Sequence, residues 1–232
     1  SVTCSNPVTA VGLDPPTNAR LQQMCLDWLA FRSVRGPRGA YGWAISGTDP
    51  KTGAPLATNI VTGAQVNINR WLVSSASHIG DVLVVITSPT GTVDSNDLAG
   101  VVQSIEKNVR PDGVSFAVSP ATPVPYVAAL VVYVRAPPAV TADALQAAIT
   151  TALSAFFAEY PIGGETVSDD AHPGGFTGLT GTAITGAAAV GVATLAGATL
   201  MSVMGAPDLA MTALQVATDT DALSVTVRII PS

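Results

Sequence analysis

Hydrophobic residues follow two spacings along this chain, one typical of helices and one typical of strands. Apolar residues recur at helical spacing over residues 21–29, 98–109 and 145–160, so we predict a helix at each. Residues 82–86 form a continuous apolar run, which is typical of a central strand covered on both faces. A longer alternating run covers residues 124–134, and its second face is also mostly apolar, so we expect both faces of that strand to be covered.

The order of these elements is repeated. A strand, a helix and two strands over residues 82–134 precede a second helix, which Thr141 caps, and two closing strands at residues 211–217 and 223–229. This order predicts an α/β (α+β) protein of two related strand–helix–strand–strand modules, with small mixed sheets covered by helices. We divide the chain into an N-terminal helical segment and linker, a first α+β module, and a second α+β module with a Gly/Ala-rich insertion, at residues 1–75, 76–136 and 137–232.

Shorter elements are expected before and within the first module. Residues 40–45 predict a short helix, and residues 66–71 alternate as a strand does, after a loop rich in Gly, Pro, Thr and Asn. Asp94 or Ser95 starts the next helix, and we interpret Asp94 and Asp97 as helix-capping residues instead of paired catalytic carboxylates.

The segment from Ala171 to Pro207 contains no Asp, Glu, Lys or Arg. Its second part, residues 183–204, is apolar but consists mostly of Ala, Gly, Val and Thr. Its length would allow a membrane span, but small residues contribute little to insertion and no Lys or Arg flanks it. We therefore predict no stable membrane span, and instead a buried or interfacial helix that packs closely against other helices.

Composition and charge narrow the possible functions. Charged residues make up 11% of the chain, against about 25% in an average soluble protein. Such a surface costs little to desolvate, which suits permanent packing against neighbours, although a stable and weakly charged monomer remains an alternative. The net charge of −6 argues against sequence-independent nucleic-acid binding and against docking on anionic lipid.

Candidate catalytic chemistry is sparse. His78 and Asp81 lie close in sequence to three serines, and a Ser–His–Asp triad can arise from any order along a chain. No G-x-S-x-G turn supports the serines, so a polar loop before the strand at residues 82–86 is the simpler interpretation. The serines concerned are Ser74, Ser75 and Ser77.

Two carboxylates and an imidazole come together at Asp169, Asp170 and His172, a set that can hold a metal ion. They lie in a Gly-rich stretch without an obvious further ligand, so we favour solvated loop charges. The two cysteines, Cys4 and Cys25, show no metal-ligand spacing, and a disulfide between them has no supporting pattern. We assign no catalytic, cofactor-binding or metal-binding residue.

An arginine cluster after the first helix is the best candidate for contacts with a partner. Arg32, Arg35 and Arg38 follow a helix that carries Trp28. Arginine is favoured at interfaces and in carboxylate recognition. The alternative is that these cations stabilise the C-terminus of the helix against its dipole, and both roles are compatible.

Several segments taken together resemble one known family. Residues 12–21 lead into a helix that ends at the small-residue break and Tyr/Trp segment of residues 35–44. This is similar to the start of the C-terminal half of baseplate J-like proteins, the wedge components of contractile phage tails and related injection machines of Mu and P2 type. Further segments resemble the family's strands, helices and turns in the same order, at residues 81–86, 89–91, 108–113, 121–127, 162–165 and 200–210.

The resemblance implies a structural protein of the virion tail baseplate. Such a protein joins copies of itself and other wedge proteins around the tail hub, without an active site, a cofactor or a small-molecule substrate. Two features depart from the family: its N-terminal arm is missing, and the Gly-rich segment at residues 169–185 is longer. The alternatives are a hydrolase that uses His78 or His172, and a carbohydrate-binding adhesin module suggested by the Thr/Gly-rich surface.

Overall fold

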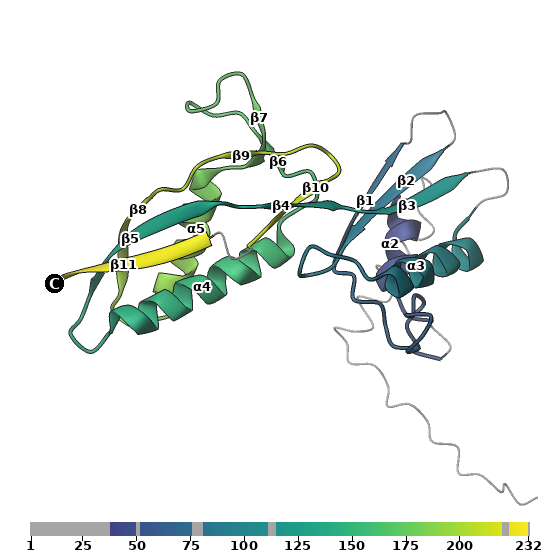
Figure 1. Ribbon diagram of the computed structural model, residues 1–232, viewed down its shortest axis with the longest axis horizontal. Coiled ribbons are helices and arrows are strands. Elements are labelled where there is room, and N and C mark those ends of the chain that lie inside the picture. The colour runs from purple at the N-terminus through teal and green to yellow at the C-terminus, as the bar shows by residue number, and fades with distance from the viewer. Residues whose placement is uncertain (1–37, 50–51, 76–80, 111–114, 220–222, 232) are drawn as a thin grey trace, which may run out of the picture.

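The computed structural model describes most of the chain after its N-terminal part, namely residues 38–49, 52–75, 81–110, 115–219 and 223–231. The helix predicted over residues 21–32, with Trp28 and Arg32, lies outside the described residues, as do Arg35, both cysteines, Ser77 and His78. Two modules lie end to end along the long axis of the molecule (Figure 1).

The first module is a three-stranded sheet with two helices. Its strands follow the order β1-β2-β3, with β1 antiparallel to β2 and β3 parallel to β2. Helix α3 makes the crossover that a parallel pair requires. The elements are α2 (Arg38–Ser46), β1 (Arg70–Ser75), β2 (Val82–Thr87), α3 (Ser95–Asn108) and β3 (Phe116–Pro120).

The core of this module lies between one face of the sheet and the two helices. Val84 and Ile86 of β2 are fully buried there together with Tyr41, Ile45, Val101 and Ile105. The short helix predicted at residues 40–45 and the helix predicted at residues 98–109 are confirmed as α2 and α3. Asp94 caps α3 by accepting a hydrogen bond from the backbone N–H of Asn96.

The second module contains three small sheets and two helices. Its largest sheet has the order β11-β5-β8, a second has the order β6-β7-β9, and β10 pairs with β4. The elements are β4 (Thr122–Pro125), β5 (Ala128–Ala136), α4 (Ala142–Glu159), β6 (Glu165–Val167), β7 (Phe176–Leu179), α5 (Gly181–Ala193), β8 (Thr199–Met204), β9 (Leu209–Ala210), β10 (Gln215–Thr218) and β11 (Leu223–Pro231).

The long strand predicted at residues 124–134 is two strands in different sheets, because the chain leaves the ladder at Tyr126 and Val127. The end of the chain runs parallel to both pieces, with Gln215 opposite Thr122 and Leu223 opposite Ala128. Tyr126 is buried at the interruption, where its ring packs against Phe157. A tightly packed aromatic side chain therefore stands where a regular strand residue was expected.

Helices α4 and α5 cover the same face of the sheet β11-β5-β8. Inward residues of β5, such as Val132, share one core with Ile149 of α4 and Ile184 of α5. The outward residues of β5, among them Tyr133 and Arg135, are half-buried or exposed. The second face of this strand, which we expected to be covered, therefore faces solvent in the described part of the chain.

The small-residue segment is a helix in its first half only. Helix α5 has 13 residues, and the strand β8 at Thr199–Met204 replaces the helix predicted there. Close packing is confirmed, since a Cβ atom at Gly191 would lie 2.7 Å from the Cα atom of Ile149 in α4. In the part of the chain that the structure covers, no helix has the length and apolar character needed to cross a membrane.

Mixed helix and sheet content confirms the predicted α+β class, in which small mixed sheets are covered by helices. Strand β5, which we assigned to residues 76–136, is the central strand of the sheet built mainly from later residues. The connection between the modules runs through Ala121 and β4. Pairing across the sheet, more than position along the chain, decides where each strand belongs.

Candidate functional site

The two modules meet at an apolar contact on the second face of β2. Val85, Ala121, Ile162 and Val216 form a buried cluster that draws residues from both modules. The backbone N–H of Ala121 donates to the carbonyl oxygen of Ile86 over 2.8 Å, which ties the connection to β2. The prediction that residues 82–86 are covered on both faces is confirmed, and one cover is the other module.

Arg70, the first residue of β1, bridges this junction. It is only 9% exposed, and its guanidinium group donates to three backbone carbonyl oxygens. Nη1 lies 2.9 Å from the oxygen of Phe157 and 2.5 Å from that of Tyr160, and Nη2 lies 3.1 Å from that of Ser88. Burial lowers the pKa of this guanidinium. Arg70, a cation of the first module, therefore offsets the partial negative charge at the C-terminal end of α4, a helix of the second module.

Helix α4 needs such a partner because its last carbonyl groups have no partners within the helix. Its last turn contains no basic residue that could complement the negative end of the helix dipole. Arg70 supplies the missing charge, and Asn69 Nδ2 donates to the carbonyl oxygen of Ala158. Asn69 and Arg70, at the start of β1, thus act as a C-terminal cap for α4, which we call the Arg70 cap.

A tight turn strengthens the same junction. Gly91 has a φ of +84°, which favours glycine, and it is buried against the β4–β10 pair. A Cβ atom at this position would lie 2.4 Å from Cγ2 of Thr218. The turn at residues 89–91 therefore packs directly against the second module.

Beside the Arg70 cap lies an open hollow of about 310 Å³, lined by Asn69, Trp71, Leu72, Glu159, Pro161 and Ile162.

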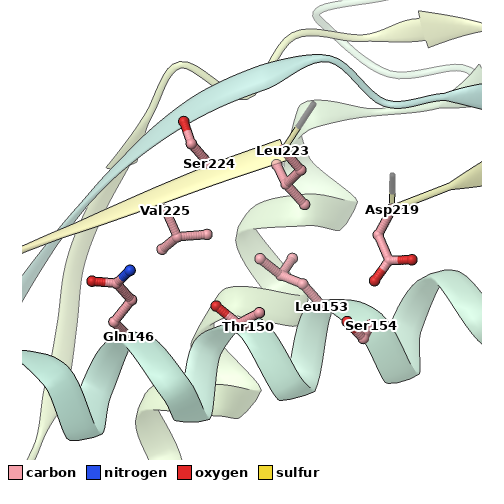
Figure 2. A pocket seen from close by; sticks show the side chains of 8 residues that line it. All are labelled: Gln146, Thr150, Leu153, Ser154, Asp219, Leu223, Ser224 and Val225. Atoms are coloured by element: carbon pink, nitrogen blue, oxygen red, sulfur yellow. The ribbon is translucent and has the colours of Figure 1, made fainter. Parts of the chain in front are cut away.

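A groove of about 410 Å³ runs between α4 and the strand β11 (Figure 2). Gln146, Thr150 and Ser154 line its helix side, and Val225 lies on its strand side. None of these four side chains carries a charge. A single carboxylate, that of Asp219, is found at one end of the groove (Figure 2).

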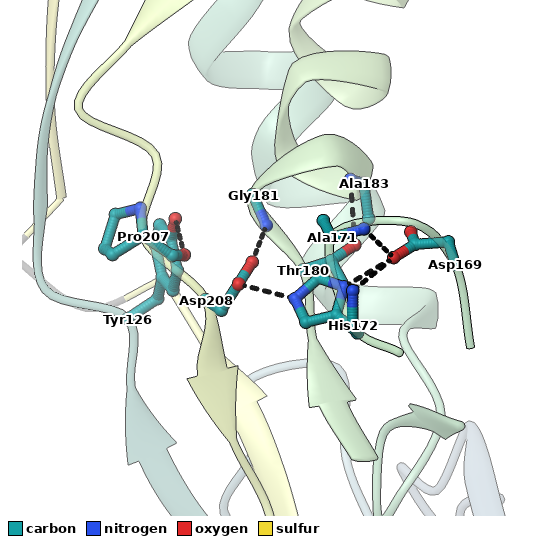
Figure 3. Close-up of polar contacts among 9 residues, drawn as sticks. All are labelled: Tyr126, Asp169, Ala171, His172, Thr180, Gly181, Ala183, Pro207 and Asp208. Atoms are coloured by element: carbon teal, nitrogen blue, oxygen red, sulfur yellow. Dashed lines mark hydrogen bonds and ion pairs between the residues drawn. The ribbon is translucent and has the colours of Figure 1, made fainter. Parts of the chain in front are cut away.

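His172 is held between two carboxylates (Figure 3). Its Nδ1 atom lies 2.8 Å from Oδ1 of Asp169, and its Nε2 atom lies 2.9 Å from Oδ2 of Asp208. Asp208 also accepts the backbone N–H of Gly181, at the start of α5. The ring stacks obliquely on Phe176 of β7, and its side chain is 16% exposed. This Asp–His–Asp cluster fastens the loop between β6 and β7 to the start of α5 and to the segment after β8.

The electrostatics of the cluster favour the charged form of every member. Hydrogen bonds to Asp208 and then Asp169 raise the pKa of His172. The N–H of Gly181 and then His172 lower the pKa of Asp208, while the bond from His172 is the main cause that lowers that of Asp169. An imidazole that donates from both nitrogens must be protonated. Both ring nitrogens are therefore occupied, and neither is free to act as a base or as a metal ligand in this arrangement.

A neighbouring tyrosine positions the segment that carries Asp208. The hydroxyl group of Tyr126 donates to the carbonyl oxygen of Pro207 over 2.7 Å (Figure 3). Burial, followed by the charge of Asp208, raises the pKa of this tyrosine to about 12. The hydroxyl therefore stays protonated and keeps donating across the pH range in which proteins are studied.

The sequence-predicted site residues have different outcomes. Asp170, expected to join Asp169 and His172, is exposed and takes no part in the cluster, whereas Asp208 was missed because it lies 36 positions away. Asp81 accepts a hydrogen bond from Ser115, and Ser74 lies in β1, but His78 is outside the described residues. Among the described residues, no group of three or more His, Cys, Asp and Glu has the arrangement of a metal site.

Of the predicted contact residues, only Arg38 lies in a described element. It is the first residue of α2, and its side chain is outside the described part. Arg70 was missed as a junction residue, although it shares the inward alternation of Val66 and Ile68. A charged residue at an inward position is rarely buried without partners, so this position could have indicated that Arg70 binds buried groups.

No family model matches this sequence, and none of the curated proteins matches it either.

Proposed function

We propose that this protein is a structural component of the baseplate wedge of a contractile tail, which joins copies of itself and other wedge proteins around the tail hub. Several segments resemble those of baseplate J-like proteins and occur in the same order along the chain, which supports this proposal. The observation that carries a structural role is the Arg70 cap, which fastens the two modules into one elongated body (Figure 1).

A part that transmits a rearrangement between neighbours needs modules that move together. The junction combines a buried apolar cluster with hydrogen bonds from Arg70 and Asn69 to the end of α4. The apolar cluster contains only four buried residues, so the resistance of this junction to relative motion depends on the buried, charge-assisted hydrogen bonds of Arg70. A force applied to one module would therefore move the other, as a strut between two partners requires.

The outer surface supports permanent packing. Large apolar side chains are exposed on several elements of the second module, and the groove beside α4 is mostly uncharged. Apolar and weakly charged surfaces are typical of the centres of lasting interfaces. The exposed side chains are Val127, Val190, Met201, Met204, Leu214, Ile229 and Ile230.

The test is reconstitution with the proteins encoded beside this one. The purified chain is mixed with each neighbour and then with all of them, and the products are separated by size and imaged by electron microscopy. We expect complexes of defined mass that close into rings or wedges when the set is complete. A chain that joins none of its neighbours, in a gene neighbourhood without sheath or tail-tube proteins, contradicts the proposal.

The hydrolase alternative is tested in the same system. Replacing His78 and His172 together by alanine removes every imidazole from the chain, since the sequence contains two histidines. The structural proposal expects this variant to assemble as the parent does, provided that it is folded. Loss of a hydrolytic activity with assembly intact would favour the enzyme.

A further inference from the structure

The outer face of the sheet β11-β5-β8, on the side away from α4 and α5, carries both arginines of the second module. Residues 121–232 contain eight Asp or Glu residues but only two Arg and no Lys. Arg135 is an outward residue of β5, and Arg228 of β11 lies opposite Tyr133, the outward residue before it. Both arginines are exposed, and neither has an ion pair or a side-chain hydrogen bond in the part of the chain that the structure describes.

The two guanidinium groups are close to each other and far from any carboxylate of their own sheet. Arg135 lies opposite Ile230, so Arg135 and Arg228 are diagonal neighbours on adjacent strands. The strands β5, β8 and β11 contain no Asp or Glu. Like charges at neighbouring positions on one face of a sheet repel each other. Carboxylates supplied by another molecule would offset this repulsion.

Apolar side chains surround the two arginines. Met204 of β8 lies opposite the outward residue Val131 and is 58% exposed, and Ile230 is 37% exposed. Tyr, Met and Arg are enriched at protein interfaces, which makes a protein a better occupant than a small anion. We call this surface the arginine face, and it consists of Val131, Tyr133, Arg135, Met204, Arg228 and Ile230.

A complementary surface lies on the same chain, in β6 and the loop that follows it. Glu165, Asp169 and Asp170 lie within six residues and are exposed. Asp170 has no hydrogen bond or ion pair among the described residues, and the bonds that Asp169 accepts there all go to its Oδ1 atom. The loop projects from the body of the module (Figure 1). We call residues 165–170 the acidic loop.

The Asp–His–Asp cluster prepares this loop for docking. It fastens Asp169 through His172 to Asp208, so the position of the neighbouring Asp170 is fixed as well. A loop that is already ordered loses less conformational entropy when it binds. The cluster therefore acts as a support for the acidic loop.

We propose that the acidic loop of one copy of this chain docks on the arginine face of a second copy. Asp169 and Asp170 then face Arg135 and Arg228, and the guanidinium groups donate charge-assisted hydrogen bonds to the two carboxylates. The two surfaces differ, so each copy can use both at once, and contacts of this kind form rings when the rotation between copies closes.

The size of the arginine face sets the expected affinity. The nine residues of β5 extend over about 30 Å and three strands over about 14 Å, which gives about 420 Å² on each copy. This is well below the area of a standard interface, so the contact is weak, with a dissociation constant of about 100 µM. Several such contacts in one assembly reinforce one another.

This inference deepens the self-association within the proposed function, but it can fail or succeed separately. A chain that self-associates through these two surfaces and joins no tail protein contradicts the proposed function and leaves the contact intact. A chain that joins tail proteins but makes no contact between these surfaces does the reverse.

The test is the average mass of the purified full-length chain in solution, measured by sedimentation from about 5 to 500 µM. We expect the mass to rise above 23.4 kDa as the concentration increases. A chain that stays monomeric at the highest concentration overturns the proposal.

Charge reversals locate the two surfaces. Arg228→Glu and Asp170→Arg should each weaken self-association at least tenfold, because each places like charges opposite one another. The control is Lys107→Glu in α3, which changes the net charge as Arg228→Glu does and should associate as the parent does. All three positions are exposed, so the variants should fold, which circular dichroism checks. Equal association of Arg228→Glu and Lys107→Glu refutes this face.

A mixture of the two weakened variants tests whether their surfaces meet. Arg228→Glu keeps the acidic loop, and Asp170→Arg keeps the arginine face. The mixture should therefore form complexes of two chains at concentrations where each variant alone is monomeric. A mixture no heavier than the separate variants contradicts the pairing.

Discussion

Replacing Arg70 by leucine tests whether the Arg70 cap holds the two modules together. The change keeps an apolar stem in the junction but removes the guanidinium donors to the carbonyl oxygens of Phe157, Tyr160 and Ser88. The oxygen of Ser88 still accepts from the backbone N–H of Gly91. Three buried carbonyl groups then lose a charged partner, and the end of α4 loses the cation that complements its dipole. We expect the variant to fold, to be less stable, and to unfold in two steps where the parent unfolds in one.

The magnitude follows from the number of bonds. A buried acceptor left without its partner costs about 1–3 kcal/mol, so the two acceptors at the end of α4 set an upper range of about 2–6 kcal/mol, while Ser88 keeps its bond from Gly91. Two effects reduce this figure: water reaches some of the freed carbonyl groups, and the variant no longer buries a guanidinium group. The lowered pKa of Arg70 shows that its burial has a cost. We therefore expect a loss of about 3 kcal/mol, or a melting temperature lower by about 10 °C.

The assay is guanidinium unfolding followed by two probes. Two of the three tryptophans, Trp43 and Trp71, belong to the first module, so fluorescence reports mainly on that module, and helical circular dichroism is dominated by α4 and α5. The control is Arg135→Leu, an exposed strand arginine without an ion pair in the described chain, which should change stability by about 0.5 kcal/mol or less. Equal midpoints for the two variants, with coincident probes in both, would refute the reasoning.

Three further substitutions have definite outcomes. Gly191→Ala should destabilise the protein by about 1–3 kcal/mol, because the added Cβ atom would meet the backbone of α4. Gly186→Ala, where no atom lies within 4 Å of the added Cβ atom, should stabilise it by up to about 1 kcal/mol. Thermal melting compares the two variants. Asp208→Asn should move the pKa of His172 back toward 6.5 in an NMR titration, since Asp208 is the main cause of its rise. The stability that His172 adds should be complete below pH 6.5 and disappear as the pH rises through its raised folded-state pKa, which chemical unfolding at several pH values checks. Asp97→Ala should cost about 2–3 kcal/mol and expose the loop before β1 to proteolysis, because its buried carboxylate accepts hydrogen bonds from two residues of that loop.

Asp97 shows what neighbouring residues along the chain predict about a side chain and what they do not. The sequence indicated a helix start with two acidic residues, and Asp94 is indeed the cap of α3. Asp97 instead binds Asn59 and the backbone N–H of Asn67. The helix start follows from neighbours along the chain, but the second role depends on a loop about 30 positions away, which no local pattern reveals.

The small-residue segment gives the same lesson for secondary structure. Residues 183–193 were recognisable as a closely packed helix because small side chains allow backbones to approach. Strand β8 was missed because it continues the same apolar, uncharged composition and alternates only weakly. Pairing with β5 makes it a strand. Composition could not separate the two conformations, and the neighbouring strand did.

Periodicity and capping residues alone determined the helices α2, α3 and α4, the central strand β2 and the α+β class, because these depend on residues within a few positions of one another. Tertiary structure alone decided that Arg70 caps α4, that Asp208 meets His172, and that β11 forms an edge. Each of these joins groups that are far apart along the chain. Contacts of this kind depend on distances in space. These distances are defined only once the sheets have paired, so they cannot be deduced from positions along the chain.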